Sequence, residues 1–219
     1  LSICFDSLTE FNTIVNITFK QACNTMKKIA LTDLLSIEEY EAQRLVIRKA
    51  IMEHKKTRRV KLGPNATLYF EDYMIMRYQV LELMRAENIT GNEELDQELQ
   101  AYNPLIPDGS NLKATLMLEY PRAEERKERL SELIGIEDSI SLEIEGHAPV
   151  HPIANEDLPR STEDKTSAVH FLRFELDKDM INSANTGSAW IIQSNHPHYQ
   201  HSHKIEDQDI VKSLLRDFS

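Results

Sequence analysis

The segment YMIMRYQVLELMRAENI, residues 73–89, decides how the rest of the chain is interpreted. Arranged as a helix it is apolar on every side, and such a helix is normally buried in the middle of a domain. Among its polar residues, Gln79, Glu82 and Arg85 have a spacing that places them on one ridge. Because an unpartnered buried polar group costs about 1–3 kcal/mol, we expect other parts of the fold to supply partners for this ridge.

The segments on either side predict further helices and strands. Ser36 and Glu39 have the spacing of a capping box, and a helix is expected from there to about Lys56. Two short β-branched and aromatic runs flank Gly63-Pro64-Asn65, which predicts two strands around a turn. Periodicity and turn residues predict helices at 93–101, 121–135 and 205–218, strands at 112–120, 139–145, 168–176 and 189–193, and a surface loop at 154–167.

Helices and strands mix in this order without regular alternation, which predicts an α+β fold with a largely antiparallel sheet packed by several helices. We expect residues 26–219 to form a single domain, because no linker rich in Pro, Gly or Ser divides them. Residues 1–25 have no basic start and no apolar run of a signal peptide, and Met26-Lys27-Lys28 resembles a bacterial start. We interpret residues 1–25 as an upstream extension or a loosely attached arm; a genuine N-terminal helix is the alternative.

Composition argues against several classes of function. The formal net charge of −11 disfavours binding to nucleic acids or anionic membranes, which need a basic face. Both cysteines precede Met26, so the body has no disulfide, thiolate nucleophile or Cys-ligated metal cluster. Six scattered glycines supply no dinucleotide or phosphate loop, so no cofactor is expected apart from a possible divalent metal. The lack of a targeting signal predicts a cytoplasmic protein.

A set of carboxylate, amide and guanidinium groups forms the first candidate site. Inward carboxylates near a histidine could bind a metal or act as acid and base. The alternative is structural, with Glu82 and Arg85 forming a buried ion pair that fixes the helix in place. The set comprises Gln79, Glu82, Arg85, Glu87, Glu98, Asn103 and Glu119.

The histidine-rich run His196-Pro197-His198-Tyr199-Gln200-His201-Ser202-His203 is the second candidate. Four imidazoles could collect zinc, copper or nickel. We expect the run to lie in a loop after a strand, where His198, His201 and His203 would be exposed and bind metal only adventitiously. His196 is expected to pack at the end of the strand, and it is the histidine that a metal-dependent site with buried carboxylates would use.

Several strings, taken together, resemble a bacterial domain-of-unknown-function family, number three-five-zero-one. The resemblance runs from about Met26 to the terminal helix, and the histidine-rich run departs from the family pattern beyond His196-Pro197 and Tyr199. The strings are Arg58-Arg59-Val60-x-x-Gly63-Pro64, Phe70-Glu71, Arg77-Tyr78-Gln79-x-x-Glu82-x-x-Arg85-Ala86-Glu87, Tyr102-Asn103-Pro104-Leu105-x-Pro107, Ala114-Thr115-Leu116-Met117-x-Glu119 and Thr166-Ser167-Ala168-Val169-x-Phe171.

This resemblance implies a class of partner protein rather than a reaction, because genes of the family tend to lie beside those for rubrerythrin-like and iron–sulfur proteins. It therefore suggests an accessory protein of a cytoplasmic redox-defence system, acting by docking, metal delivery or stabilisation of a partner. The proline-bounded turn with Tyr102, Leu105 and Ile106 is the candidate docking element. A metal-dependent enzyme and a plain interaction module are the alternatives.

Overall fold

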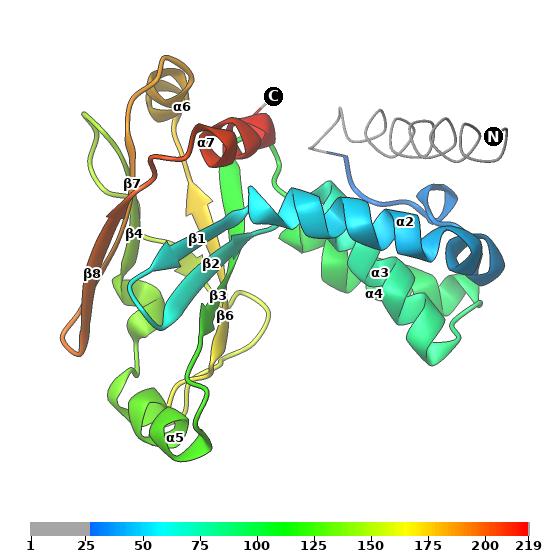
Figure 1. The fold of residues 1–219 in the computed structure, drawn as a ribbon, viewed down its shortest axis with the longest axis horizontal. Helices are drawn as coiled ribbons and strands as arrows, with labels where there is room; N and C mark the ends of the chain where they lie inside the picture. The colour runs from blue at the N-terminus through cyan, green and yellow to red at the C-terminus, as the bar shows by residue number, and fades with distance from the viewer. Residues whose placement is uncertain (1–26, 219) are drawn as a thin grey trace, which may run out of the picture. The chain divides into compact units, whose positions relative to one another are not determined.

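A computed structural model describes residues 27–218 of the chain (Figure 1). The expectation for residues 1–25 lies outside the described residues. The chain falls into two compact units, each described here by itself. Within the described range, unit 1 comprises residues 27–56 and 72–108, and unit 2 comprises residues 57–71 and 109–218. The single domain expected for residues 26–219 stays a prediction.

Unit 1 is helical. It contains α2 (Ile37–Lys56), α3 (Tyr73–Glu87) and α4 (Asn92–Tyr102), with short 3-10 turns at Leu31–Asp33 and Asn103–Leu105. As the sequence predicts, α3 is buried over most of its circumference; Tyr73, Met74, Ile75, Met76, Tyr78, Val80, Leu81 and Met84 all belong to the core of this unit.

Local chemistry sets where these helices begin and end. The predicted capping box is present, because the Glu39 carboxylate accepts from Ser36 N at 2.9 Å and Ser36 Oγ accepts from Glu39 N at 3.2 Å. The Asp72 carboxylate caps α3 by accepting from Ile75 N at 2.9 Å. Asn88 ends α3 in the left-handed conformation, with φ of 53°, which asparagine tolerates better than most residues.

Unit 2 holds two antiparallel sheets. The first has the strand order β1-β2-β3-β6-β5 and the second β4-β7-β8. The strands are β1 (Arg59–Leu62), β2 (Ala66–Phe70), β3 (Asn111–Leu118), β4 (Ile140–Ile144), β5 (Ile153–Ala154), β6 (Val169–Glu175), β7 (Trp190–His196) and β8 (Tyr199–Lys204).

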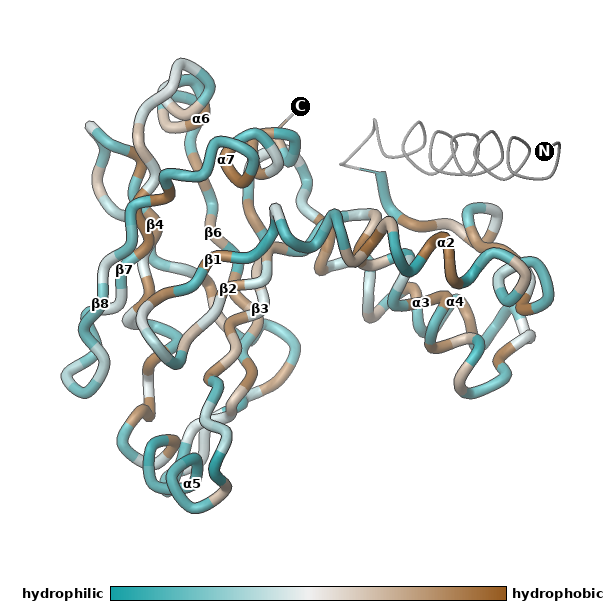
Figure 2. Tube along the Cα trace, in the orientation of Figure 1, coloured by the Kyte–Doolittle hydropathy of each residue, from teal (hydrophilic) through white to brown (hydrophobic). Residues whose placement is uncertain are grey.

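Three helices complete unit 2: α5 (Ala123–Glu132), α6 (Lys178–Asn185) and α7 (Gln208–Leu215), with 3-10 turns at Ile136–Ser139 and Arg216–Phe218. Both sheets contribute to one apolar core, which includes Leu68, Leu116, Phe174 and Trp190. Figure 2 shows hydrophobic segments recurring along these strands. The α+β class with antiparallel sheets is therefore confirmed.

Two sequence-based expectations need correction. The segment after His196 was expected to be a loop, but it forms a tight hairpin in which Tyr199–Lys204 is strand β8, paired with β7. Helix α6 was not expected; the local signal that the sequence offered for it was Asp177, whose carboxylate caps the helix by accepting from Met180 N at 2.8 Å. None of the helices between residues 27 and 218 combines the length and apolar character that crossing a bilayer requires.

Candidate functional site

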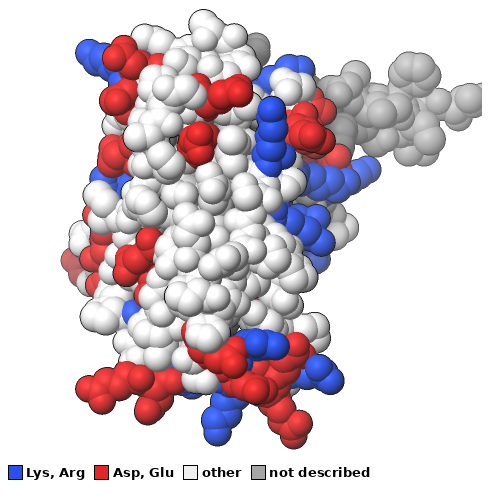
Figure 3. All heavy atoms as spheres, turned by 90° about the vertical axis from the view of Figure 1, so that its left-hand side faces the viewer, with Lys and Arg blue, Asp and Glu red and all other residues white. Residues whose placement is uncertain are grey.

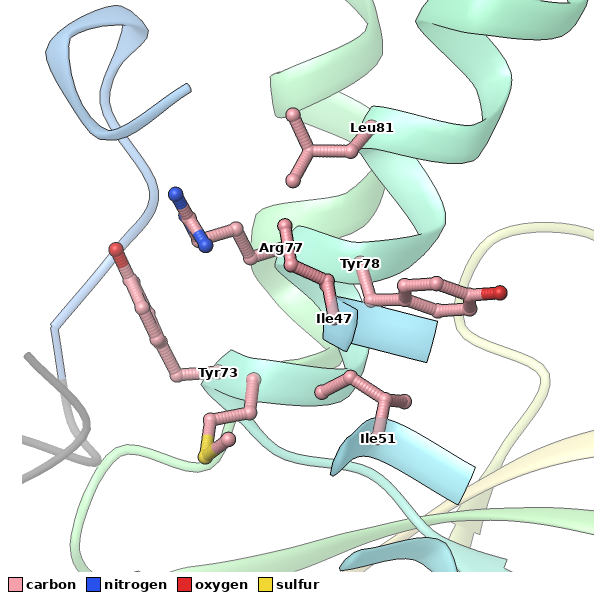
Figure 4. Close-up of a pocket in the computed structure, with 7 residues that line it drawn as sticks. Ile47, Ile51, Tyr73, Arg77, Tyr78 and Leu81 are labelled. Carbon is pink, nitrogen blue, oxygen red and sulfur yellow. The ribbon is translucent and has the colours of Figure 1, made fainter. Parts of the chain in front are cut away.

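A small cavity lies between α2 and α3 within unit 1 (Figure 4). Its volume is about 10 Å³, which is room for about one water molecule. Tyr73 and Arg77 form its polar side, and Arg77 Nε donates to the carbonyl oxygen of Asp33 at 2.7 Å. Burial raises the pKa of Tyr73 to about 12, with the nearby Asp33 carboxylate adding to the effect. A cavity of this size has no room for an organic substrate.

Glu82, on the polar ridge of α3, is held by α2. Arg44 donates to both carboxylate oxygens, Nε to Oε1 at 2.8 Å and Nη2 to Oε2 at 2.9 Å, and the Tyr40 hydroxyl also donates to Oε1. The Arg44 hydrogen bonds hold the pKa of Glu82 at about 2, well below its ordinary value. Arg85 lies farther away, at 3.8 Å. The expected ion pair of Glu82 with Arg85 is present but long and only partly buried, and the shorter bidentate contact comes from Arg44, which sequence spacing could not reveal.

Asn103 fastens the start of unit 1 to the end of α4. Its Oδ1 accepts from Ile29 N at 2.7 Å, and its Nδ2 donates to Ile29 O at 3.0 Å. The Lys28 ammonium donates to Asn103 O at 2.7 Å and to Ile106 O at 3.3 Å. The amide of Asn103 thus pairs with a peptide group as a neighbouring strand would. These contacts, here called the Asn103 clamp, fix the segment before α2 against the 3-10 turn after α4.

An open groove of about 800 Å³ runs beside this clamp. Residues 28–32 line one wall, and Asp96, Leu99, Gln100, Asn103 and Pro104 line the other. The groove therefore borders the turn that the sequence selected as a docking element. Tyr102 and Leu105 are half-buried in that turn, whereas Ile106 is fully buried in the core and presents no surface to a partner.

The remaining polar candidates do not form one cluster. Gln79, Glu87 and Glu98 belong to unit 1, whereas Glu119 belongs to unit 2, where it is exposed and accepts from Thr67 Oγ1 at 2.7 Å. Among residues 27–218, no group of three or more His, Cys, Asp or Glu side chains has an arrangement that could hold a metal ion.

The four histidines of the histidine-rich run differ in their surroundings. His196 packs at the end of β7, as expected, and both of its ring nitrogens have partners: Nε2 lies 3.1 Å from Ile134 O, and Nδ1 accepts from His198 N at 3.3 Å. His198 and His203 are exposed, as expected. His201 is instead half-buried, because its ring packs edge-on against Tyr199 with the ring centroids 4.5 Å apart.

A buried polar cluster in unit 2, here called the His170 cluster, was not expected. It consists of Glu137, Asn155, Ser161, Thr166 and His170. The His170 ring is fully buried on β6. Its Nδ1 lies 3.0 Å from Asn155 Nδ2 and 3.6 Å from Glu137 Oε1, and its Nε2 lies 3.0 Å from both Thr166 Oγ1 and Ser167 O.

These partners define the proton position on His170. A carbonyl oxygen only accepts, so Nε2 must carry the proton that is shared with Ser167 O. Nδ1 then accepts from the Asn155 amide. Burial lowers the pKa of His170, partly opposed by the Glu137 carboxylate. This tautomer leaves His170 unable to act as a base toward Thr166, so the cluster ties loop 155–167 to β6.

A family model described as "Protein of unknown function (DUF3501)" matches residues 28–218. The chain belongs to the DUF3501 family. A crystal structure of a novel protein of unknown function from Burkholderia pseudomallei K96243 is 42% identical, with a TM-score of 0.83 over 88% of this chain and 100% of that chain. No curated protein matches the chain.

Within this DUF3501 chain, sequence reasoning missed Glu137 and His170. One signal was present, because His170 occupies the open position in the family string Thr166-Ser167-Ala168-Val169-x-Phe171. It also falls at an inward position of an alternating strand, whose buried residues are His170, Leu172 and Phe174. A histidine on the apolar face of a strand needs buried partners, and Glu137, which lies 33 positions earlier, could not be paired with it from sequence spacing.

Proposed function

We propose that this DUF3501 protein is a non-catalytic accessory factor that docks to, and stabilises, a rubrerythrin-like or iron–sulfur protein of a cytoplasmic redox-defence system. The family resemblance supplies the class of partner. The observation that carries the proposal is the open groove in unit 1, which borders the turn selected from the sequence as the docking element. Its volume and exposed walls suit a segment of a partner protein.

The groove is preorganised for binding. The Asn103 clamp on Ile29 and the Lys28 bonds to Asn103 and Ile106 fix both of its walls within the isolated chain. A binding surface that is already fixed loses less conformational entropy when a partner docks. This rigidity supports docking as the role of the turn that contains Tyr102 and Leu105.

The groups that an enzyme would need are committed to other contacts. Glu82 stays ionised in its pairing with Arg44, so it is a poor proton donor near neutral pH. Both ring nitrogens of His196 are occupied by main-chain partners. These contacts favour the accessory role over the metal-dependent enzyme that would use buried carboxylates with His196.

The test measures association with purified rubrerythrin-like and iron–sulfur proteins encoded in the same genome. Calorimetry at about 50 μM would detect a micromolar complex. Gln100→Trp places a large side chain in the groove from an exposed position of α4 and should weaken binding at least about tenfold. Gln97→Trp, on the same helix but outside the groove lining, is the matched control and should leave binding within about twofold.

Ile106→Asp is unsuitable as a probe, because that side chain is buried and its replacement would disrupt the core of unit 1. Absence of association with either partner at about 50 μM would contradict the proposal. Association that tolerates Gln100→Trp as well as Gln97→Trp would show that the groove is not the docking site.

A further inference from the structure

Strand β8 forms an uncovered edge of the three-stranded sheet in unit 2. Among residues 27–218 its one strand neighbour is β7, whereas the opposite edge strand, β4, is covered by a two-way bridge between Leu142 and Val150. In Figure 1, β8 lies at the outer left of unit 2. Exposed edge strands are ready to pair with another strand, and proteins usually protect them with prolines, bulges or charges. Between Tyr199 and Lys204, the only such feature is Lys204 itself.

The register shows which backbone groups of β8 point outward. Ile205 N donates to Trp190 O at 2.8 Å, so Trp190 and Ile205 form a hydrogen-bonded pair of the β7–β8 ladder. The pairs Ile192↔His203 and Ser194↔His201 follow at steps of two residues and are therefore of the same kind. Backbone groups alternate in direction along an antiparallel strand. The N–H and C=O groups of Gln200, Ser202 and Lys204 therefore point to the free edge. All three residues are exposed, and their main-chain groups have no hydrogen bond in the described part of the chain.

The distribution of charge over the chain favours a second copy of this chain as the partner for the β8 edge. The chain carries a net charge of −11, so two copies repel one another unless they meet at a neutral surface. Residues 188–203 contain no Asp, Glu, Lys or Arg, in a chain of which 28% is charged. Figure 3 views the side on which β8 lies in Figure 1; charged side chains gather around the margins of this face, most densely at its lower end, and its central region is largely uncharged. Depletion of charge is typical of the centre of an interface.

The geometry points to a two-fold dimer in which β8 pairs antiparallel with β8 of a second copy. Centring the pair on Ser202 opposes Gln200 of each copy to Lys204 of the other, so that every outward-pointing backbone group gains a partner and no like charges face each other. The three-stranded sheets would then join into one continuous six-stranded sheet. Because the same patch serves both copies, the assembly closes at two chains.

Sedimentation velocity of the untagged chain, from about 1 to 200 μM, measures the dimerisation constant. Ser202→Pro removes an N–H group that points away from β7, so the hairpin should persist while dimerisation weakens at least about tenfold. Ser202→Ala keeps the N–H group and is the matched control. An unchanged melting temperature in both variants shows that the fold is intact.

Two further variants test the register. Gln200→Lys opposes like charges across the interface twice and should weaken dimerisation roughly threefold to tenfold, whereas Gln200→Glu opposes a carboxylate to Lys204 and should strengthen it by a similar factor. A chain that stays monomeric up to about 200 μM overturns the proposal, as does a dimer that is insensitive to Ser202→Pro. Equal effects of Gln200→Lys and Gln200→Glu overturn the register centred on Ser202.

Discussion

Arg58 and Asp217 are 159 residues apart in the chain and form a buried ion pair in unit 2. Arg58 Nη2 donates to Asp217 Oδ2 at 2.6 Å, and Nη1 donates to Oδ1 at 3.0 Å. The same guanidinium donates to the carbonyl oxygens of Phe70, Glu71 and Ser213. Arg58 thus joins the start of β1 to the end of β2 and to the C-terminal turns through a bidentate contact that lysine could not reproduce.

Removing one partner of this pair should be strongly destabilising. Asp217→Ala removes the Asp217 carboxylate from the buried Arg58 guanidinium, and we expect the free energy of unfolding to fall by about 3–5 kcal/mol. Urea unfolding at neutral pH measures the change. Glu206→Ala, at an exposed position that precedes α7, is the control and should change stability by less than about 0.5 kcal/mol. A loss below 1 kcal/mol for Asp217→Ala would contradict the prediction.

Glu82 should stabilise unit 1 only while it is ionised. Its folded-state pKa of about 2 lies below its ordinary value of 4.5, so the contribution is complete above pH 4.5 and is lost as the pH falls toward 2. Glu82→Gln should lower the free energy of unfolding by about 1–3 kcal/mol at neutral pH. The difference from the wild type should shrink in the acid range.

Unfolding series at several pH values test this dependence. Glu41→Gln is a suitable control, because Glu41 is half exposed and its contact with Arg85 is long, at 3.4 Å. We expect it to change stability by less than about 1 kcal/mol. A Glu82→Gln effect that stays constant from neutral to acid pH would show that the carboxylate acts by packing alone.

His170 should make stability depend on pH near neutrality. Its folded-state pKa is lowered by burial, with Arg160 lowering it and Glu137 and Asp138 raising it. The unfolded chain therefore takes up this proton first, and stability falls as the pH drops below about 6.5. His170→Gln should be less stable at neutral pH and should lose this part of the slope. His203→Gln, at an exposed site, should retain the wild-type slope; equal slopes in all three proteins would refute the assignment.

Gly63 needs both its backbone freedom and its missing side chain. Its φ is +69°, and a Cβ there would lie 2.6 Å from the His201 ring. Gly63→Ala should lower the free energy of unfolding by about 2–4 kcal/mol, through left-handed strain and through the clash. His201→Ala should rescue only the clash, so the double variant should recover part of the loss. Gly187→Ala, with φ of +99° and open space, should show the strain alone.

Much of the local structure could be read from the sequence, because its causes are local. The Gly63-Pro64-Asn65 turn, the Ser36 and Glu39 capping box and the all-apolar period of α3 involve residues within a few positions of one another. These signals also gave the α+β class. The run Tyr199–Lys204 carries little apolar signal, so its strand state depends on hydrogen bonds to β7.

The partners of the polar residues were decided by tertiary structure. Periodicity placed Glu82 on a ridge of α3, but the choice of Arg44 over Arg85 follows from how α2 packs on α3, 38 positions away in sequence. The same holds for His170 with Glu137 and for Arg58 with Asp217. A sequence shows that a buried charge needs a partner, because desolvation is costly; which partner it meets depends on chain segments that only the folded backbone brings together.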